Sequence, residues 1–213
     1  MKISWLGHAC FLIETASKTT IITDPYQPGA FSGAVKYLPI GETADIVTIS
    51  HHHADHDFTE GLTSATIIDK EGVFTVKDVK VEGIGSFHDS SLGSQRGKNI
   101  IFIIETEGLR IVHFGDVGTL DLDFDRLKNI DVAMVPVGGV FTINHKDATV
   151  LLKKLQPKIF IPMHFKTHKL EFNIDGVDKF LEDKSDIERQ KSLVISRDSL
   201  GDQTKIVVLE HLR

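Results

Sequence analysis

The alternation of apolar and polar positions predicts mainly short β-strands in the first half of the chain. Lys2–Leu6 and Ala9–Glu14 are rich in apolar residues and are separated by a hairpin-like break at Gly7-His8. Thr20–Thr23 ends at Asp24-Pro25, where proline cannot continue a central ladder, so the chain must leave the sheet there. Further strands are expected at Asp45–Ile49, Ala65–Asp69, Val73–Val76 and Val79–Gly85.

The second half repeats this outline and adds two helices. Strands are expected at Ile100–Glu105, Leu109–Phe114, Asp131–Val135, Lys158–Pro162, Leu193–Ser196 and Lys205–Leu209. Apolar residues recur at helical spacing within Lys146–Gln156 and again within Ile174–Lys184. Many strands followed by few helices indicate sheets packed on each other with helices outside, a mixed α/β (α+β) protein.

Two long segments carry loop signals rather than strand or helix patterns. Gln27–Glu42 contains Gly29, Gly33, Pro39 and Gly41, and Asp89–Asn99 is rich in serine and glycine. Loops of this length in a compact domain are usually functional. No linker-like tract divides the 213 residues, so we expect one domain over residues 1–213.

Composition and charge narrow the classes of partner. The net charge of −6 argues against a nucleic-acid binder with a broad basic face, although it leaves room for a local positive pocket that takes an anionic small molecule. No apolar run approaches membrane-spanning length and no signal-peptide pattern opens the chain, so we expect a cytoplasmic protein without membrane contact. The single cysteine, Cys10, lies in an apolar run and is interpreted as a buried thiol rather than a nucleophile. A homo-oligomer stays open.

Histidine is the unusual residue type, because four of the 11 histidines fall between His51 and His56. The segment contains the pattern His-x-His-x-Asp-His. In an extended segment, residues two apart point the same way, so His51 and His53 can bind one metal ion together. Asp55 and His56 follow as the chain turns and can face a second ion. Imidazole and carboxylate donors suit Zn²⁺, and also Mn²⁺, Fe²⁺ or Ni²⁺.

Four donors do not complete two metal sites, and three more stand where strands end. His88 follows one strand, Asp116 lies in a glycine-rich turn after another, and His164 follows a third. Donors at strand ends can converge on one edge of a sandwich, and a carboxylate such as Asp116 can bridge two ions. The pattern therefore predicts a two-metal site.

These residues belong to a wider pattern that resembles the metallo-β-lactamase superfamily. Within it, the chain is similar to the branch that includes ascorbate-6-phosphate lactonases and N-acylphosphatidylethanolamine phospholipase D. The resemblance rests on Trp5-Leu6-Gly7-His8, Thr23-Asp24-Pro25, the His51–His56 motif, His88 with the loop to Gly115-Asp116, and Pro162-Met163-His164. It covers most of the chain, and no donor position departs from the family pattern. The insertion that converts relatives into RNA-processing nucleases is absent.

The resemblance implies a four-layer αββα sandwich with two metal ions at one edge. It implies that His51, His53 and His88 bind one ion, that Asp55, His56 and His164 bind the other, and that Asp116 bridges them. Asp24 would brace the loop that holds the ligands instead of binding metal; the alternative is an ordinary turn carboxylate.

The expected function is hydrolysis of an ester, lactone or phosphodiester by water activated between two metal ions, with a small-molecule substrate. Asp55, Asp116 and His8 are the candidate catalytic residues, with Asp55 accepting a proton; His8 could instead be a hairpin histidine. The alternatives are a di-iron oxidoreductase and a metal-binding module without catalysis.

Several nearby residues keep two interpretations. Arg96 and Lys98 lie either in a solvated loop or in an anion-binding one, and Lys166 and His168 are surface residues that could touch substrate. His52 and His113 are expected to support the site or the core rather than to bind metal, and His145 and His211 are expected at the surface.

Overall fold

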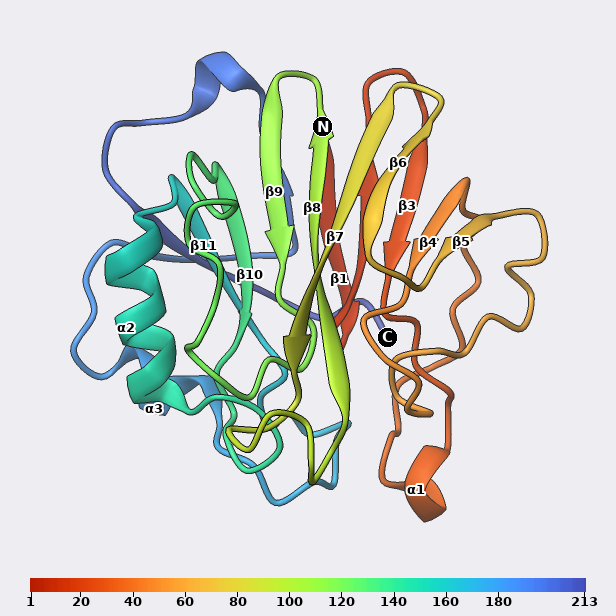
Figure 1. Ribbon diagram of the computed structural model, residues 1–213, viewed down its shortest axis with the longest axis vertical. Helices are drawn as coiled ribbons and strands as arrows, with labels where there is room; N and C mark the ends of the chain where they lie inside the picture. The colour runs from red at the N-terminus through yellow and green to blue at the C-terminus, as the bar shows by residue number, and fades with distance from the viewer.

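The computed structural model describes residues 1–213 and places two β-sheets face to face (Figure 1). The first sheet has six strands in the order β13-β1-β2-β3-β4-β5. These strands are β1 (Lys2–Gly7), β2 (Cys10–Glu14), β3 (Thr20–Thr23), β4 (Ile46–Thr48), β5 (Thr66–Ile68) and β13 (Ser192–Val194). The proline after β3 ends that strand as expected, and β4 then pairs parallel to β3.

The second sheet has eight strands in the order β12-β14-β11-β10-β9-β8-β7-β6. They are β6 (Gly72–Val76), β7 (Val79–Phe87), β8 (Lys98–Thr106), β9 (Leu109–His113), β10 (Val132–Pro136), β11 (Ile159–Met163), β12 (Ile187–Gln190) and β14 (Lys205–Leu209). Strands β9, β10 and β11 are parallel to one another, and β7 and β9 are both antiparallel to β8. The carboxyl ends of β7, β9, β10 and β11 therefore meet at one edge, the lower edge in Figure 1.

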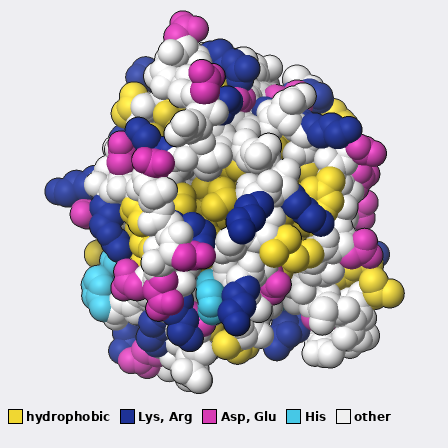
Figure 2. All heavy atoms as spheres, turned by 90° about the vertical axis from the view of Figure 1, so that its left-hand side faces the viewer, with side chains coloured by type: hydrophobic (Ala, Val, Ile, Leu, Met, Phe, Trp, Pro, Cys, Tyr) yellow, Lys and Arg dark blue, Asp and Glu magenta, His cyan; other side chains and the backbone are white.

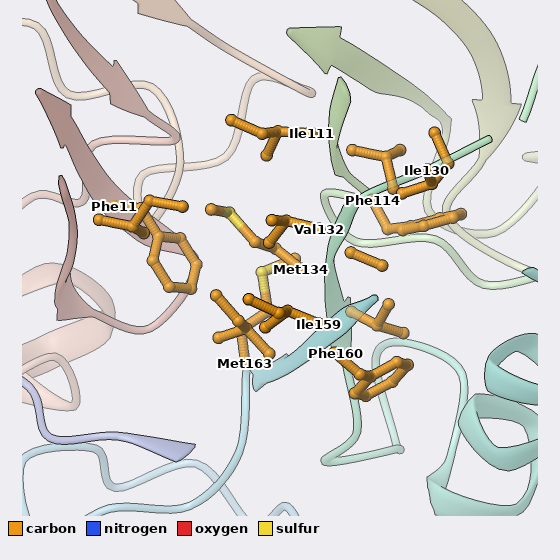
Figure 3. Packing of buried hydrophobic residues seen from close by; sticks show 14 of the residues in the cluster. Phe11, Ile111, Phe114, Ile130, Val132, Met134, Ile159, Phe160 and Met163 are labelled. Carbon is orange, nitrogen blue, oxygen red and sulfur yellow. The ribbon is translucent and has the colours of Figure 1, made fainter. Parts of the chain in front are cut away.

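The hydrophobic core lies between the sheets. Phe11 of the first sheet points toward Met134 and Met163 of the second, and all three are fully buried (Figure 3). The core forms one continuous cluster of 45 buried residues that draws on both sheets, so neither sheet buries its inner face without the other.

Two helices cover the outer face of the second sheet (Figure 1). They are α2 (His145–Leu155) and α3 (Val177–Leu181). Phe160 of β11 points away from the sandwich and stacks on Phe180 of α3, with ring centroids 5.0 Å apart. Asn144 caps α2 by accepting hydrogen bonds from the backbone N–H groups of Lys146 and Asp147.

The outer face of the first sheet is covered mainly by irregular chain. A second apolar cluster there contains Tyr26 and Tyr37 from the chain between β3 and β4, together with the buried Cys10. The loop's one helical stretch is α1 (Ala30–Gly33), in which Phe31 and Ser32 have left-handed backbone angles. The sandwich is thus the expected α/β architecture, with one of its two outer layers almost without regular helix.

The observed elements differ from the predicted ones at a few places. Strand β12 was not expected, because Ile187–Gln190 is an exposed edge strand with little apolar pattern. Helix α3 occupies only the middle of the predicted Ile174–Lys184 helix. Strand β13 ends at Val194, and Arg197–Ser199 forms a short 3₁₀ turn instead of continuing it.

The surface carries charges of both signs. On the face with α2 and α3, basic and acidic side chains are interspersed around small apolar patches (Figure 2). No helix combines the length and the apolar character that a membrane crossing requires.

Candidate metal centre

The predicted donors lie at the carboxyl ends of strands from both sheets. The His51–His56 segment follows β4 of the first sheet. From the second sheet, His88 follows β7, Asp116 follows β9, and His164 follows β11. Because these strands end at one edge of the sandwich, the fold brings together side chains that are more than 100 residues apart in sequence.

Four imidazoles converge on a single carboxylate oxygen. The Oδ2 atom of Asp116 lies 3.2 Å from Nε2 of His164, 3.3 Å from Nε2 of His88, 3.3 Å from Nε2 of His56 and 4.0 Å from Nε2 of His51. Asp116 therefore stands between the histidines of the motif and those of the second sheet, where a bridging ligand would stand.

The donors form three overlapping groups; two of these contain the two expected ligand sets, and the third joins His51 and His56 to Asp24. Ligand atoms of His51, His53 and His88 lie within 4.8 Å of one another. Those of Asp55, His56 and His164 do so as well, and His8 belongs to the same group. Nε2 of His8 lies 3.0 Å from Oδ2 of Asp55, so this buried histidine is next to the second group, as one of its two interpretations required.

The buried Asp24 carboxylate anchors the His51–His56 segment through hydrogen bonds. Its Oδ1 accepts a hydrogen bond from the backbone N–H of Ser50, and its Oδ2 accepts one from the Ser50 hydroxyl. The same Oδ2 lies 2.9 Å from Nδ1 of His56, while Nδ1 of His51 lies 3.0 Å from the Ser50 hydroxyl. With the proton of each imidazole on Nδ1, both histidines present the Nε2 lone pair toward Asp116.

Two glycines permit the backbone crossings on which this geometry depends. A Cβ atom on Gly118 would lie 2.4 Å from the backbone carbon of His88. One on Gly138 would lie 2.3 Å from the backbone oxygen of His164. Any side chain at either position would push a donor out of place.

The electrostatic environment suits neutral imidazole and ionised carboxylate ligands. Burial lowers the pKa of His51 to about 3, and burial also lowers the pKa of His88. Burial alone would raise the pKa of Asp116, but His164 and His56 hold this pKa well below its usual range.

The pKa of His56 is shifted in the opposite direction, upward. Burial opposes its charging, yet the carboxylates of Asp116 and Asp55 raise the pKa of His56 well above its ordinary value. A proton on this imidazole offsets part of the negative charge around it. A divalent cation would supply that positive charge and take the place of the proton.

Unpartnered atoms give a test of whether the residues fit metal ions. Nε2 of His51, Nε2 of His56 and Oδ1 of Asp116 are buried, and none has a hydrogen-bond partner in the protein. Leaving such groups unpaired costs on the order of 1–3 kcal/mol each, so a native protein normally satisfies them. Donors of nitrogen and oxygen type, facing one another without partners, fit divalent metal ions.

The donors open into a cleft of about 290 Å³. Five of its nine lining residues are donors, and the other four are Arg96, Phe31, Phe141 and Phe172. Arg96 belongs to the loop after β7, which was expected to be either solvated or anion-binding. The buried carboxylate of Asp89 orders this loop by accepting hydrogen bonds from four backbone N–H groups, including that of Arg96 at 2.8 Å.

Other sequence candidates lie outside the cleft. Lys166 donates a hydrogen bond to the backbone oxygen of Phe172, and neither Lys166 nor His168 lines the cleft. Lys98 faces a neighbouring polar groove. His52 is exposed and pairs with Asp57, whereas His113 is buried and bonds to the backbone oxygen of Ala9.

Sequence reasoning missed several residues that shape the site. Buried Asn99 accepts a hydrogen bond from the backbone N–H of Asp116 and donates one to the backbone oxygen of Phe114, which fixes the Asp116 turn. A lone polar residue at the start of an apolar strand was the only signal. The three phenylalanines carried none, because exposed aromatic residues in loops have no characteristic spacing.

Comparison with known proteins places these features in a family. A family model described as "Beta-lactamase superfamily domain" matches residues 2–164. A UPF0173 metal-dependent hydrolase of Thermococcus kodakarensis is 32% identical over 195 residues, which cover 78% of this chain and 85% of that protein. A UPF0173 metal-dependent hydrolase of Carboxydothermus hydrogenoformans is 34% identical over 200 residues, covering 78% and 85%.

Solved structures include a similar protein at full length. A crystal structure from Thermotoga maritima, described as that of a candidate Zn-dependent hydrolase of the metallo-beta-lactamase superfamily, is 38% identical with a TM-score of 0.79. The match covers 99% of this chain and 98% of that one. Fold and sequence therefore agree over the whole molecule.

Proposed function

Because this chain belongs to the metallo-β-lactamase superfamily, we propose that it is a metal-dependent hydrolase with a two-metal site that cleaves an ester, lactone or phosphodiester. The observation that supports two ions most directly is the position of the Asp116 carboxylate. It lies between two groups of three donors, and four imidazole Nε2 atoms lie within 4.0 Å of its Oδ2.

His51, His53 and His88 would hold one ion, Asp55, His56 and His164 the other, and Asp116 both. Bound there, a divalent ion supplies Lewis acidity, which lowers the pKa of water from about 15.7 toward about 7 and polarises a substrate oxygen. Zn²⁺ is the ion we propose, because the nitrogen-rich donor set suits it and a relative of 38% identity is described as Zn-dependent.

The remaining chemistry falls to the chain's own residues. Asp55 lines the cleft and stays ionised, because His56 and His8 hold its pKa low against the effect of burial. Its carboxylate is thus able to take the proton that an attacking water must lose. Burial lowers the pKa of His8 to about 4, so His8 is neutral and its Nε2–H donates to Oδ2 of Asp55. We assign His8 the role of positioning Asp55.

The donor set and its setting favour catalysis over a purely structural role. Structural zinc sites are usually closed by four ligands, whereas here seven donors cluster together and five of them line a cleft that admits a small molecule. The cytoplasmic location expected from the sequence stays a prediction.

Metal analysis combined with an activity screen tests the proposal. Protein loaded in turn with Zn²⁺, Mn²⁺ and Fe²⁺ is assayed on lactones, carboxylic esters, thioesters and phosphodiesters. We expect two ions per chain, one ion in His88→Ala, and turnover of at least one substrate class. Two bound ions without turnover on the whole panel would favour the non-catalytic module, and an iron-dependent visible absorbance would favour the di-iron alternative.

A further inference from the structure

Three phenylalanines form one wall of the cleft beside the donors. They come from three separate segments: Phe31 from α1, Phe141 from the turn after β10, and Phe172 from the chain after β11. The Phe172 ring contacts the other two edge to face, with centroids 5.5 Å from Phe31 and 5.6 Å from Phe141. Phe31 is 53% exposed and Phe141 is 37% exposed, so much of this aromatic surface is open.

The protein holds this exposed wall in place. Backbone hydrogen bonds from Lys36 to Lys169 and from Glu171 to Ala34 tie the Phe31 loop to the Phe172 segment. The Lys166 ammonium donates to the backbone oxygen of Phe172. An aromatic cluster that is fixed yet left open to solvent is typical of a surface that binds a ligand.

Part of the backbone beneath the wall is strained. Phe31 has a φ of 53° and Val140, the residue before Phe141, has a φ of 63°. Left-handed conformations are costly for residues with a Cβ, and especially for a β-branched one. Strain of this kind tends to persist where function requires a particular side-chain position.

The Arg96 guanidinium places a positive charge at the same cleft. The guanidinium carbon of Arg96 lies 5.7 Å from the ring centroid of Phe141, and no carboxylate oxygen lies within 4.0 Å of this side chain. Its backbone is fixed by Asp89. Arg96 also lines the neighbouring polar groove, so an anionic group bound to it has room to extend away from the phenylalanines.

We propose that this cleft selects substrates that carry an aromatic group at one end and an anionic group at the other. The aromatic group would pack on Phe31, Phe141 and Phe172, and the carboxylate or phosphate would pair with Arg96. This proposal rests on the proposed hydrolase function for the reaction itself, and it names the substrate class of that site.

Three acetyl esters separate the two halves of the proposal. 4-Acetoxybenzoate has both an aromatic ring and a carboxylate, phenyl acetate has only the ring, and acetoxyacetate has only the carboxylate. Arg96→Gln is expected to lower kcat/KM at least tenfold for the two anionic esters and less than threefold for phenyl acetate, because it removes only the cation. Lys191→Gln is the matched control, since Lys191 is an exposed cation between β12 and β13 that lines neither the cleft nor the polar groove.

The aromatic wall is tested with Phe172→Leu, which keeps an apolar side chain but removes the central ring. The expected result is at least a fivefold loss of kcat/KM for the two aromatic esters and little change for acetoxyacetate. Phe74→Leu is the matched control, because Phe74 is also a half-buried phenylalanine and lies on β6 away from the cleft.

Binding provides a readout that does not depend on turnover. Calorimetric titration of the metal-loaded protein should give a Kd for 4-hydroxybenzoate at least tenfold below that for phenol, and Arg96→Gln should remove at least half of this difference on a logarithmic scale. If this pattern holds but no ester, lactone or phosphodiester is turned over, the ligand class stands and the hydrolase proposal fails. If hydrolysis occurs but both variants slow all three esters equally, the cleft assignment is overturned and the hydrolase proposal stands.

Discussion

The Asp24 carboxylate shows how a residue that does not face the cleft can determine what the site does. The carboxylate is fully buried, and its Oδ2 accepts hydrogen bonds from the Ser50 hydroxyl and from Nδ1–H of His56. The Ser50 oxygen in turn accepts a hydrogen bond from Nδ1–H of His51. The proposed ligands His51 and His56 thereby obtain their tautomer and their ring orientation from one group. Removing such outer partners from metal sites typically lowers metal affinity about 10- to 100-fold.

Asp24→Asn should therefore weaken metal binding about 10-fold or more without removing a ligand. Competition with a chelator of known affinity measures the effect. Asp45→Asn is a suitable control, because Asp45 bonds to the backbone of Thr20 at the opposite end of the same strand. Equal affinities for Asp24→Asn and the wild type would show that Asp24 does not orient the ligands.

Gly118→Ala should disturb the His88 position most directly. The added Cβ would lie 2.4 Å from the His88 backbone, so His88 must move, while the donors after β4 and β11 keep their supports. We expect about one bound ion in place of two, measured by elemental analysis of purified protein. Gly176→Ala is the control, because a Cβ there meets no atom within 4 Å. Two tightly bound ions in Gly118→Ala would contradict the assignment of His88.

The titration of His113 should make the stability of the folded protein depend on pH. Burial lowers its pKa, while the unfolded chain binds a proton near pH 6.5. As the pH falls below about 6.5, the unfolded state is protonated first, so the folded state loses stability. In metal-free protein, His113→Asn should flatten the fall in Tm between pH 7.5 and pH 5.5, because the asparagine does not titrate. Parallel Tm profiles for variant and wild type would show that His113 contributes nothing to the slope.

At the scale of elements, the cap of α2 is the clearest local contribution to stability. The Asn144 side chain accepts from two backbone N–H groups that would otherwise lack partners. Asn144→Ala should lower the free energy of unfolding by about 1 kcal/mol. Urea titration checks this as a lower midpoint with an unchanged slope, and Lys146→Ala in the first turn serves as the control. A midpoint equal to that of the wild type would argue that solvent satisfies these groups equally well.

Elements with strong apolar periodicity could be predicted from the sequence, and weakly patterned ones could not. Thirteen of the fourteen strands and both larger helices correspond to predicted segments. Strand β12 was missed because three of its four side chains are exposed and give no apolar pattern, so its β-structure comes from backbone pairing with β14. The left-handed turn at Phe31 and Ser32 was missed because tertiary contacts impose it against the local preference of both residues.

The metal donors, their supporting residues and the wall of the cleft differ in how far the sequence predicts them. The donors could be found because metal chemistry restricts them to few residue types and because strand ends place them at one edge. Their supports could not, since Asn99 and Ser50 are common polar residues whose roles depend on distant backbone atoms. The cleft wall depends on three loops whose approach to one another is set by the whole fold.

At the scale of the whole molecule, the donors come from both sheets, so metal binding should stabilise the sandwich as a unit. Metal ions at about 100 times their Kd contribute about 2.7 kcal/mol per site through binding to the folded state alone. Removing both ions with a chelator should lower Tm by about 10–20 °C for a chain of this size. The control is a doubly substituted His53→Ala, His164→Ala protein, whose Tm should not respond to the chelator. An unchanged Tm in the wild type would argue against tightly bound ions.

The position of Asp116 between donors from opposite sheets has a consequence for the core. Ligand distances around a metal ion vary by only a few tenths of an ångström, whereas the spacing of the sheets depends on how side chains such as Phe11, Met134 and Met163 pack. The affinity for two metal ions bound between donors of the two sheets would therefore depend on the distance between the sheets. Enlarging or shrinking a residue deep inside the sandwich would then change ion affinity even though that residue touches neither the ions nor the substrate.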